Sequence, residues 1–128
     1  MTGNQGTAVL IVDDEAEFAS TLAERLALRN FSASVAFDGE SALKRLETES
    51  FDIVLLDVML PGMHGIEVLR RIRAIAPDQA VILLTGQAGA KDGIEGMKQG
   101  AKGYLTKPVD LRELLELFED LKEGDRHA

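Results

Sequence analysis

A chain of 128 residues, 45% of them hydrophobic, predicts one globular domain built around a single core. Its 22 acidic residues outnumber its 14 basic residues, and the resulting charge of −8 argues against direct binding to nucleic acid or to an anionic membrane. The absence of cysteine excludes disulfides and thiolate metal sites. Because the apolar runs are too short for a membrane span and the first residues form no signal peptide, we expect a cytoplasmic protein.

Short apolar runs alternate with helical patterns along the chain. The runs predict strands near residues 8–12, 31–36, 52–56, 80–84 and 102–106, and the patterns predict helices near 15–29, 39–48, 65–75, 91–99 and 110–122. Nearly continuous apolar strands are typical of a parallel sheet that is covered on both faces. The repeated strand–helix order therefore predicts a three-layer α/β sandwich with right-handed crossovers. We expect the domain to span residues 7–122, with flexible ends at 1–6 and 123–128.

Two helix ends carry recognisable signals. Asp110 and Glu113 have the spacing of a capping box, which predicts Asp110 as the N-cap of the last helix. Gly100 follows the fourth predicted helix, where a C-cap glycine is expected.

Polar residues stand at the ends of the predicted strands. Asp13 and Asp14 follow the first strand, Asp57 follows the third, and Thr85 and Lys107 follow the fourth and fifth. Because ligand sites in open α/β sheets lie at the carboxyl ends of the strands, we expect these side chains to form one site. Three acids and one base in such a site suit a divalent cation and a phosphoryl group.

The chemistry of this site depends on a cation. Carboxylates held close together repel one another unless a cation compensates them, and Mg²⁺, with Mn²⁺ as an alternative, suits that role. The ionised carboxylate of Asp57 is then predicted to attack an electrophilic phosphorus and form an aspartyl phosphate. Lys107 would pair with the phosphoryl oxygens, and the hydroxyl of Thr85 would donate a hydrogen bond to one of them.

The same residues carry a resemblance to bacterial two-component response-regulator receiver domains. It covers about residues 7–122 and rests on four segments in order: Val12-Asp13-Asp14-Glu15, Asp57-Val58-Met59-Leu60-Pro61-Gly62-Met63-His64-Gly65, Leu84-Thr85-Gly86 and Lys107-Pro108. Each segment alone would be weak, but their joint order and spacing are specific. The resemblance implies a flavodoxin-like, chemotaxis-regulator-like sheet with strand order 2-1-3-4-5.

The resemblance also implies a role for each acidic residue of the site. Asp57 is similar to the phosphoacceptor of the family. Asp14 resembles the main acidic Mg²⁺ ligand, and Asp13 resembles the residue that holds a metal-bound water. The backbone carbonyl of Met59 resembles the third protein ligand, beside the carboxylates of Asp14 and Asp57.

Further implied roles concern the response to phosphorylation. Thr85 and Tyr104 resemble the switch pair, in which the hydroxyl moves toward the phosphoryl group and the ring turns inward behind it. Lys107 resembles the phosphate-binding lysine, and its bond to Pro108 resembles a cis peptide of the family.

Two positions, Met59 and Gln87, stand where the family varies most around the site and are expected to modulate its chemistry. An apolar Met59 side chain offers no hydrogen bond to an attacking water, so we expect a long-lived aspartyl phosphate. His64, just before Gly65, is expected to be solvated in a surface turn.

The function implied by the resemblance is that of a signalling phosphoacceptor rather than an enzyme. A histidine kinase or histidine phosphotransfer protein would donate the phosphoryl group. The surface formed by the fourth helix, last strand and last helix would then bind a downstream protein. The sequence leaves open a phosphorylation-dependent dimer, and either a stand-alone receiver or the receiver part of a longer regulator or hybrid kinase.

Two other functions compete with this interpretation. A phosphohydrolase of the haloacid-dehalogenase type also forms an aspartyl phosphate, but it has a second aspartate two residues after the nucleophile, where this chain has Met59. A flavodoxin-like flavin binder needs a hydroxyl-rich or glycine-rich loop after the first strand. This chain has Asp13, Asp14 and Glu15 there, and these acids would repel a phosphate unless a metal intervened.

Overall fold

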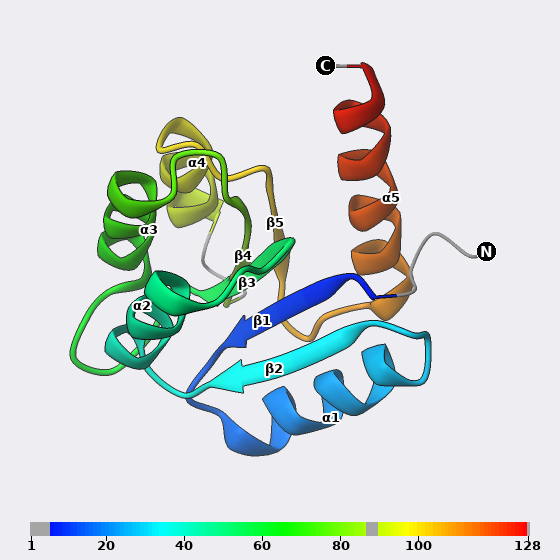
Figure 1. Cartoon of the computed structure of the whole chain (residues 1–128). Helices are drawn as coiled ribbons and strands as arrows, with labels where there is room; N and C mark the ends of the chain where they lie inside the picture. Colours follow the sequence, from blue (N-terminus) through cyan, green and yellow to red (C-terminus); the bar gives the residue numbers. More distant parts are fainter. Residues whose placement is uncertain (1–5, 87–89, 128) are drawn as a thin grey trace.

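The computed structural model describes residues 6–86 and 90–127, which form a five-stranded parallel sheet covered by helices on both faces (Figure 1). The elements in chain order are β1 (Ala8–Val12), α1 (Ala16–Ala27), β2 (Ser32–Ala36), α2 (Gly39–Thr48), β3 (Ile53–Asp57), α3 (Gly65–Ile75), β4 (Ala80–Thr85), α4 (Ala90–Lys98), β5 (Gly103–Thr106) and α5 (Leu111–His127). The strand order is β2-β1-β3-β4-β5, so the predicted three-layer fold and its strand order are confirmed.

Alternating strand residues build two cores, one on each face of the sheet. Leu10 and Val12 of β1 pack with residues of α2 and α3, whereas Val9 and Ile11 pack with residues of α1 and α5. Figure 1 shows α2, α3 and α4 on one side of the sheet and α1 and α5 on the other. Because both faces are buried, the strands read as continuous apolar runs rather than alternating ones.

The last helix is longer than predicted. The apolar pattern ended the prediction at residue 122, but α5 runs to His127, so most of the segment expected to be a flexible end is helical. The prediction stopped early because it followed the apolar stripe, whereas backbone hydrogen bonding continues through polar residues when no proline interrupts it. Among the described residues, no helix has the length and hydropathy needed to cross a membrane.

The local signals at the helix ends have mixed outcomes. Oδ1 of Asp110 accepts a hydrogen bond from the backbone N–H of Arg112 at 2.8 Å, so Asp110 caps α5, although not through the predicted Glu113. Gly100 has a φ of +100°, and the N–H of Ala101 donates to the carbonyl of Gly96 at 2.9 Å, which confirms the predicted C-terminal turn of α4. The Lys107–Pro108 peptide is cis, as expected.

Candidate functional site

The predicted site residues meet at the carboxyl-terminal edge of the sheet. Asp13 directly follows β1, Asp57 is the last residue of β3, and Lys107 directly follows β5. Asp13 is fully buried and Asp57 is 5% exposed, whereas Asp14 is exposed. Two buried carboxylates at one edge require a compensating charge, because a buried ion without a partner loses its hydration and gains no interaction that offsets the loss.

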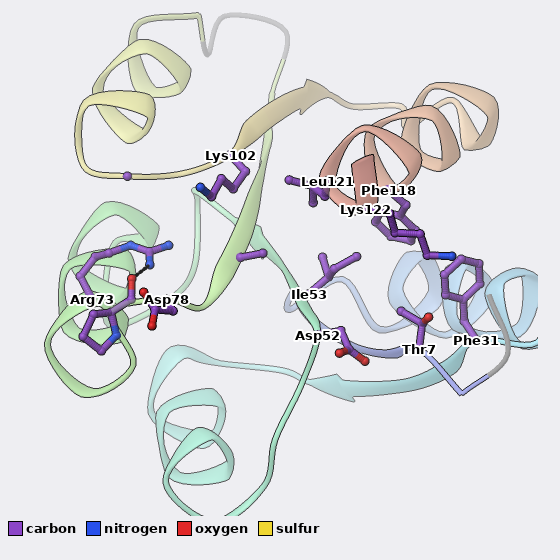
Figure 2. Close-up of a pocket in the computed structure, with 13 residues that line it drawn as sticks. Thr7, Phe31, Asp52, Ile53, Arg73, Asp78, Lys102, Phe118, Leu121 and Lys122 are labelled. Carbon is purple, nitrogen blue, oxygen red and sulfur yellow. Dashed lines mark hydrogen bonds between the residues drawn. The ribbon is translucent and has the colours of Figure 1, made fainter. Parts of the chain in front are cut away.

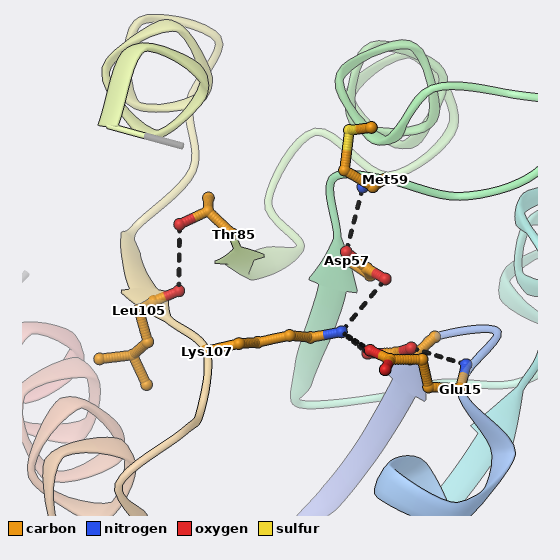
Figure 3. Close-up of polar contacts among 7 residues, drawn as sticks. Glu15, Asp57, Met59, Thr85, Leu105 and Lys107 are labelled. Atoms are coloured by element: carbon orange, nitrogen blue, oxygen red, sulfur yellow. Dashed lines mark hydrogen bonds and ion pairs between the residues drawn. The ribbon is translucent and has the colours of Figure 1, made fainter. Parts of the chain in front are cut away.

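Lys107 supplies that charge in the structure. Its Nζ lies 2.7 Å from Oδ2 of Asp13, 2.5 Å from Oε1 of Glu15 and 3.3 Å from Oδ2 of Asp57. Figure 3 shows the lysine extended from the end of β5 across the mouth of the site toward β3 and β1. The Lys107 ammonium, which follows β5, therefore contacts acidic residues at the carboxyl ends of β1 and β3, where the predicted chemistry occurs.

Burial and neighbouring charges act on the ionisation of this cluster in opposite directions. Burial raises the pKa of Asp57 above its usual range, and the nearby charge of Asp13 adds to the rise, although the Met59 N–H and Lys107 oppose it. Burial disfavours the ammonium form of Lys107, but the surrounding carboxylates outweigh that effect and raise its pKa. The lysine is therefore charged throughout the physiological pH range.

Three carboxylates could hold a metal ion here. Each of Asp13, Asp14 and Asp57 offers one oxygen, and these oxygens all lie within 4.8 Å of one another. Oδ2 of Asp13 is buried, and its partner among the described residues is the Lys107 ammonium at 2.7 Å. An all-oxygen set of three converging carboxylates, two of them buried, fits a hard divalent cation such as Mg²⁺.

The loop after β3 is held close to Asp57. The backbone N–H of Met59 donates to Oδ1 of Asp57 at 3.0 Å, while the Met59 side chain is 66% exposed. Gly65, at the start of α3, donates its N–H to the carbonyl of Val58 at 2.7 Å. A Cβ atom at this glycine would lie 2.5 Å from the carbonyl oxygen of Asp57, so only glycine permits this approach. Gln87, predicted to modulate the site, lies outside the described residues.

The predicted switch pair lies beside the site without touching the acidic cluster. The hydroxyl of Thr85 donates to the carbonyl of Leu105 on β5 at 3.5 Å, and Figure 3 shows it directed away from Asp57. The ring of Tyr104 is 37% exposed and packs on the backbone of Gly93 in α4, where an added Cβ would lie 2.6 Å from a ring carbon.

The sequence of this chain matches the model of one protein family. The model described as "Response regulator receiver domain" matches residues 9–119, which include Asp13, Asp57, Thr85 and Lys107. The chain belongs to this family. This match confirms the resemblance to receiver domains that the sequence showed. The receiver domain is a signalling domain.

Relatives of this receiver domain are bacterial regulators. "Sensory transduction protein RegX3" of Mycolicibacterium smegmatis is 45% identical over 109 residues, covering 85% of this chain and 47% of the relative. "Transcriptional regulatory protein DltR" of Streptococcus agalactiae is 38% identical over 107 residues, covering 84% and 48%. The receiver domain thus spans about half the length of these relatives.

Solved receiver domains have the same fold. The CheY-like response regulator receiver domain protein from Methanospirillum hungatei superposes with a TM-score of 0.88 at 30% identity, covering 97% of this chain and 100% of that one. The receiver domain of the Francisella response regulator 1452 gives a TM-score of 0.84 at 31% identity, covering 93% and 99%.

Two residues of this receiver domain contact Lys107 although the sequence did not predict them as site residues, and His64 has a structural role at the start of α3. Glu15 pairs with Lys107, and the ring of Phe18 lies 4.7 Å from the lysine Nζ. Nδ1 of His64, expected to be merely solvated, accepts the N–H of Ile66 at 3.1 Å and caps α3. A third acid after Asp13 and Asp14 was a visible signal for Glu15, whereas no local signal distinguished Phe18 from the other apolar residues of α1.

A cavity of about 650 Å³ lies at the opposite edge of the receiver domain's sheet (Figure 2). It is lined by residues at the amino-terminal ends of strands, among them Thr7, Ile53 and Ala80. On its rim, the guanidinium of Arg73 donates to the carbonyls of Pro77 and Gln79 at 2.7 and 2.6 Å. The Arg73 guanidinium therefore stabilises the loop between α3 and β4. The acidic cluster lies far from this cavity, at the other end of the strands.

Proposed function

We propose that the chain is a phosphoacceptor of a two-component phosphorelay and that Asp57 receives the phosphoryl group. The observation that supports this most directly is the position of Asp57, buried at the end of β3 within 3.3 Å of the Lys107 ammonium and close to the carboxylates of Asp13 and Asp14. The proposed receiver unit spans residues 7–122, which includes the matched segment.

The phosphoryl transfer is a substitution at phosphorus. An oxygen of the Asp57 carboxylate bonds to phosphorus while the phosphorus–nitrogen bond of a phosphohistidine donor breaks, and the electron pair leaves with the imidazole nitrogen. Mg²⁺, held by the carboxylates of Asp13, Asp14 and Asp57 and the carbonyl of Met59, would supply positive charge against the phosphoryl oxygens.

Lys107 and Thr85 would bind the transferred group. The Lys107 ammonium already lies 3.3 Å from Asp57, so it needs little movement to pair with a phosphoryl oxygen. The hydroxyl of Thr85 must leave the carbonyl of Leu105 to reach the same group, and Tyr104 on β5 would follow it. The new dianionic group thereby shifts the equilibrium between two arrangements of the α4–β5–α5 surface, as a two-state switch requires.

The proposed partners are proteins. A histidine kinase or histidine phosphotransfer protein donates the phosphoryl group, and a downstream protein binds the surface formed by α4, β5 and α5. The charge of −8 disfavours contact between this chain and the phosphates of nucleic acid. One relative is named a transcriptional regulatory protein, so output through a DNA-binding segment in a longer protein is the alternative to a stand-alone receiver.

The test is phosphorylation by acetyl phosphate, followed by intact mass, with and without Mg²⁺. We expect one phosphoryl adduct in the wild type that requires Mg²⁺ and is absent from Asp57→Asn. Asp52→Asn is the matched control, because Asp52 directly precedes the other end of the same strand and should leave labelling unchanged. An adduct that persists in Asp57→Asn, or no adduct in the wild type, would refute the proposal. Continuous phosphate release without an adduct would favour the phosphohydrolase.

A further inference from the structure

The Lys107 ammonium has a fourth neighbour besides its three carboxylates. Its Nζ lies 4.7 Å from the centroid of the Phe18 ring, a separation at which a cation is attracted by the negative face of an aromatic ring. The Lys107 side chain is only 18% exposed, so water screens this attraction less than it would at an open surface. Among the described residues, Lys107 is the only lysine that contacts an aromatic ring in this way.

The position of the ring is fixed by the packing of α1. Phe18 lies in the first turn of α1, three residues after Glu15, and is half-buried against the core that α1 and α5 share. Phe18 also lines a groove together with Pro108 and Val109, which directly follow Lys107. The ring is therefore anchored by apolar contacts that do not depend on the charge of the lysine.

This arrangement places the ammonium against two of the carboxylates that could hold a metal ion. Nζ of Lys107 lies within 3.3 Å of carboxylate oxygens of Asp13 and Asp57, which both belong to the candidate metal cluster. A divalent cation in this cluster is repelled by the ammonium and competes with it for the same oxygens. Any residue that holds the ammonium over the cluster must therefore weaken the affinity for the metal.

We propose that Phe18 is a positioning residue that holds the Lys107 ammonium over the acidic cluster and thereby sets the balance between lysine and divalent cation at Asp13 and Asp57. The ring does not touch the reacting atoms, and it acts through Lys107. The inference rests on the proposed function for the biological meaning of that balance, but the balance itself is a property of the unphosphorylated protein.

The first test is a titration of the unphosphorylated chain with Mg²⁺ alone. Phe18→Leu keeps an apolar side chain but removes the ring face, and we expect it to bind Mg²⁺ about two to five times more tightly than wild type. Phe18→Tyr keeps the ring and should restore the wild-type affinity. Phe37→Leu makes the same change in an exposed phenylalanine that follows β2 and has no cation beside it among the described residues, so it should have no effect.

The second test separates an effect through Lys107 from a general effect on α1. In a Lys107→Met background, Phe18→Leu should leave the Mg²⁺ affinity unchanged, because no ammonium remains to be positioned. In the metal-free protein, the Hε protons of Lys107 should show an upfield ring-current shift in NMR spectra of the wild type and Phe18→Tyr, and lose it in Phe18→Leu.

Three outcomes would overturn the proposal: unchanged or weaker Mg²⁺ binding by Phe18→Leu, an equal change in the Lys107→Met background, or lysine proton shifts that are the same in all variants. Failure of acetyl phosphate to label the wild type would refute the proposed function and leave these measurements unaffected. If Phe18→Leu fails to fold, the proton shifts in the wild type and Phe18→Tyr still decide the position of the ammonium.

Discussion

Replacing Lys107 with methionine removes the only cation that the structure places against Asp13 and Asp57 within the described residues, while the apolar stem above Phe18 is kept. Breaking a buried ion pair by removing one partner costs about 3–5 kcal/mol, because a buried charge is left uncompensated. Lys107 is partly exposed, and Asp57, whose pKa burial already raises, can take up a proton. We therefore expect Lys107→Met to lose about 3 kcal/mol of unfolding free energy in metal-free buffer.

Urea unfolding followed by circular dichroism measures this loss. With an m-value of about 2 kcal/mol/M, the midpoint should fall by about 1.5 M. Mg²⁺ at about 100 times its Kd adds about 2.7 kcal/mol to the native state, so saturating Mg²⁺ should restore most of the loss. Lys102→Met is the matched control: Lys102 is exposed, and its replacement should change stability by less than about 0.5 kcal/mol. A loss below about 1 kcal/mol for Lys107→Met, or one that Mg²⁺ does not reduce, would refute this reasoning.

Three other changes test separate parts of the structure. Gly65→Ala places a Cβ 2.5 Å from the carbonyl oxygen of Asp57, so it should cost about 3 kcal/mol in urea unfolding and weaken Mg²⁺ binding; unchanged stability would contradict the close packing. Asp38 caps α2 through the Ser41 N–H, a contact that lowers the pKa of its carboxyl. Asp38→Ala should therefore cost about 1 kcal/mol at neutral pH. The pH-dependent contribution of this cap to the free energy of unfolding is complete above the unfolded-state pKa of Asp38 and is lost as the pH falls through its lower folded-state pKa. An equal cost of Asp38→Ala at pH 7 and in strong acid would argue against a charged cap. Met59→Asn offers a hydrogen bond to an attacking water and should speed loss of the phosphoryl group several-fold, measured by intact mass over time, whereas an unchanged rate would remove the proposed role of Met59.

The sheet and the acidic cluster could be predicted because their signals are local and repeated. Each buried strand is a continuous apolar run, and the residue that follows it lies at a common edge whatever the details of packing. The runs that end at Val12 and Leu56 therefore predict that Asp13 and Asp57 lie near one another. The structure confirms that proximity through their shared contact with Lys107.

The surroundings of Lys107 could not be predicted from local signals. Glu15 and Lys107 are 92 residues apart, and their contact depends on where the turn after β5 directs the lysine. Phe18 belongs to the apolar stripe of α1, and only the tertiary arrangement shows that its ring also faces a cation. The end of α5 was missed for the opposite reason: its last residues carry no apolar pattern, yet the backbone continues as a helix.

The contact between Gly93 and Tyr104 limits how the two positions can vary. A ring carbon would lie 2.6 Å from any Cβ at residue 93, so every other amino acid there displaces the tyrosine from its present resting place. Gly93 lies in α4, whereas the acidic cluster lies at the ends of β1 and β3, so we expect its replacement to leave the cluster intact. A single substitution at residue 93 would therefore change the part of the surface that Tyr104 occupies. The present position of the Tyr104 ring can be kept only while residue 93 is glycine.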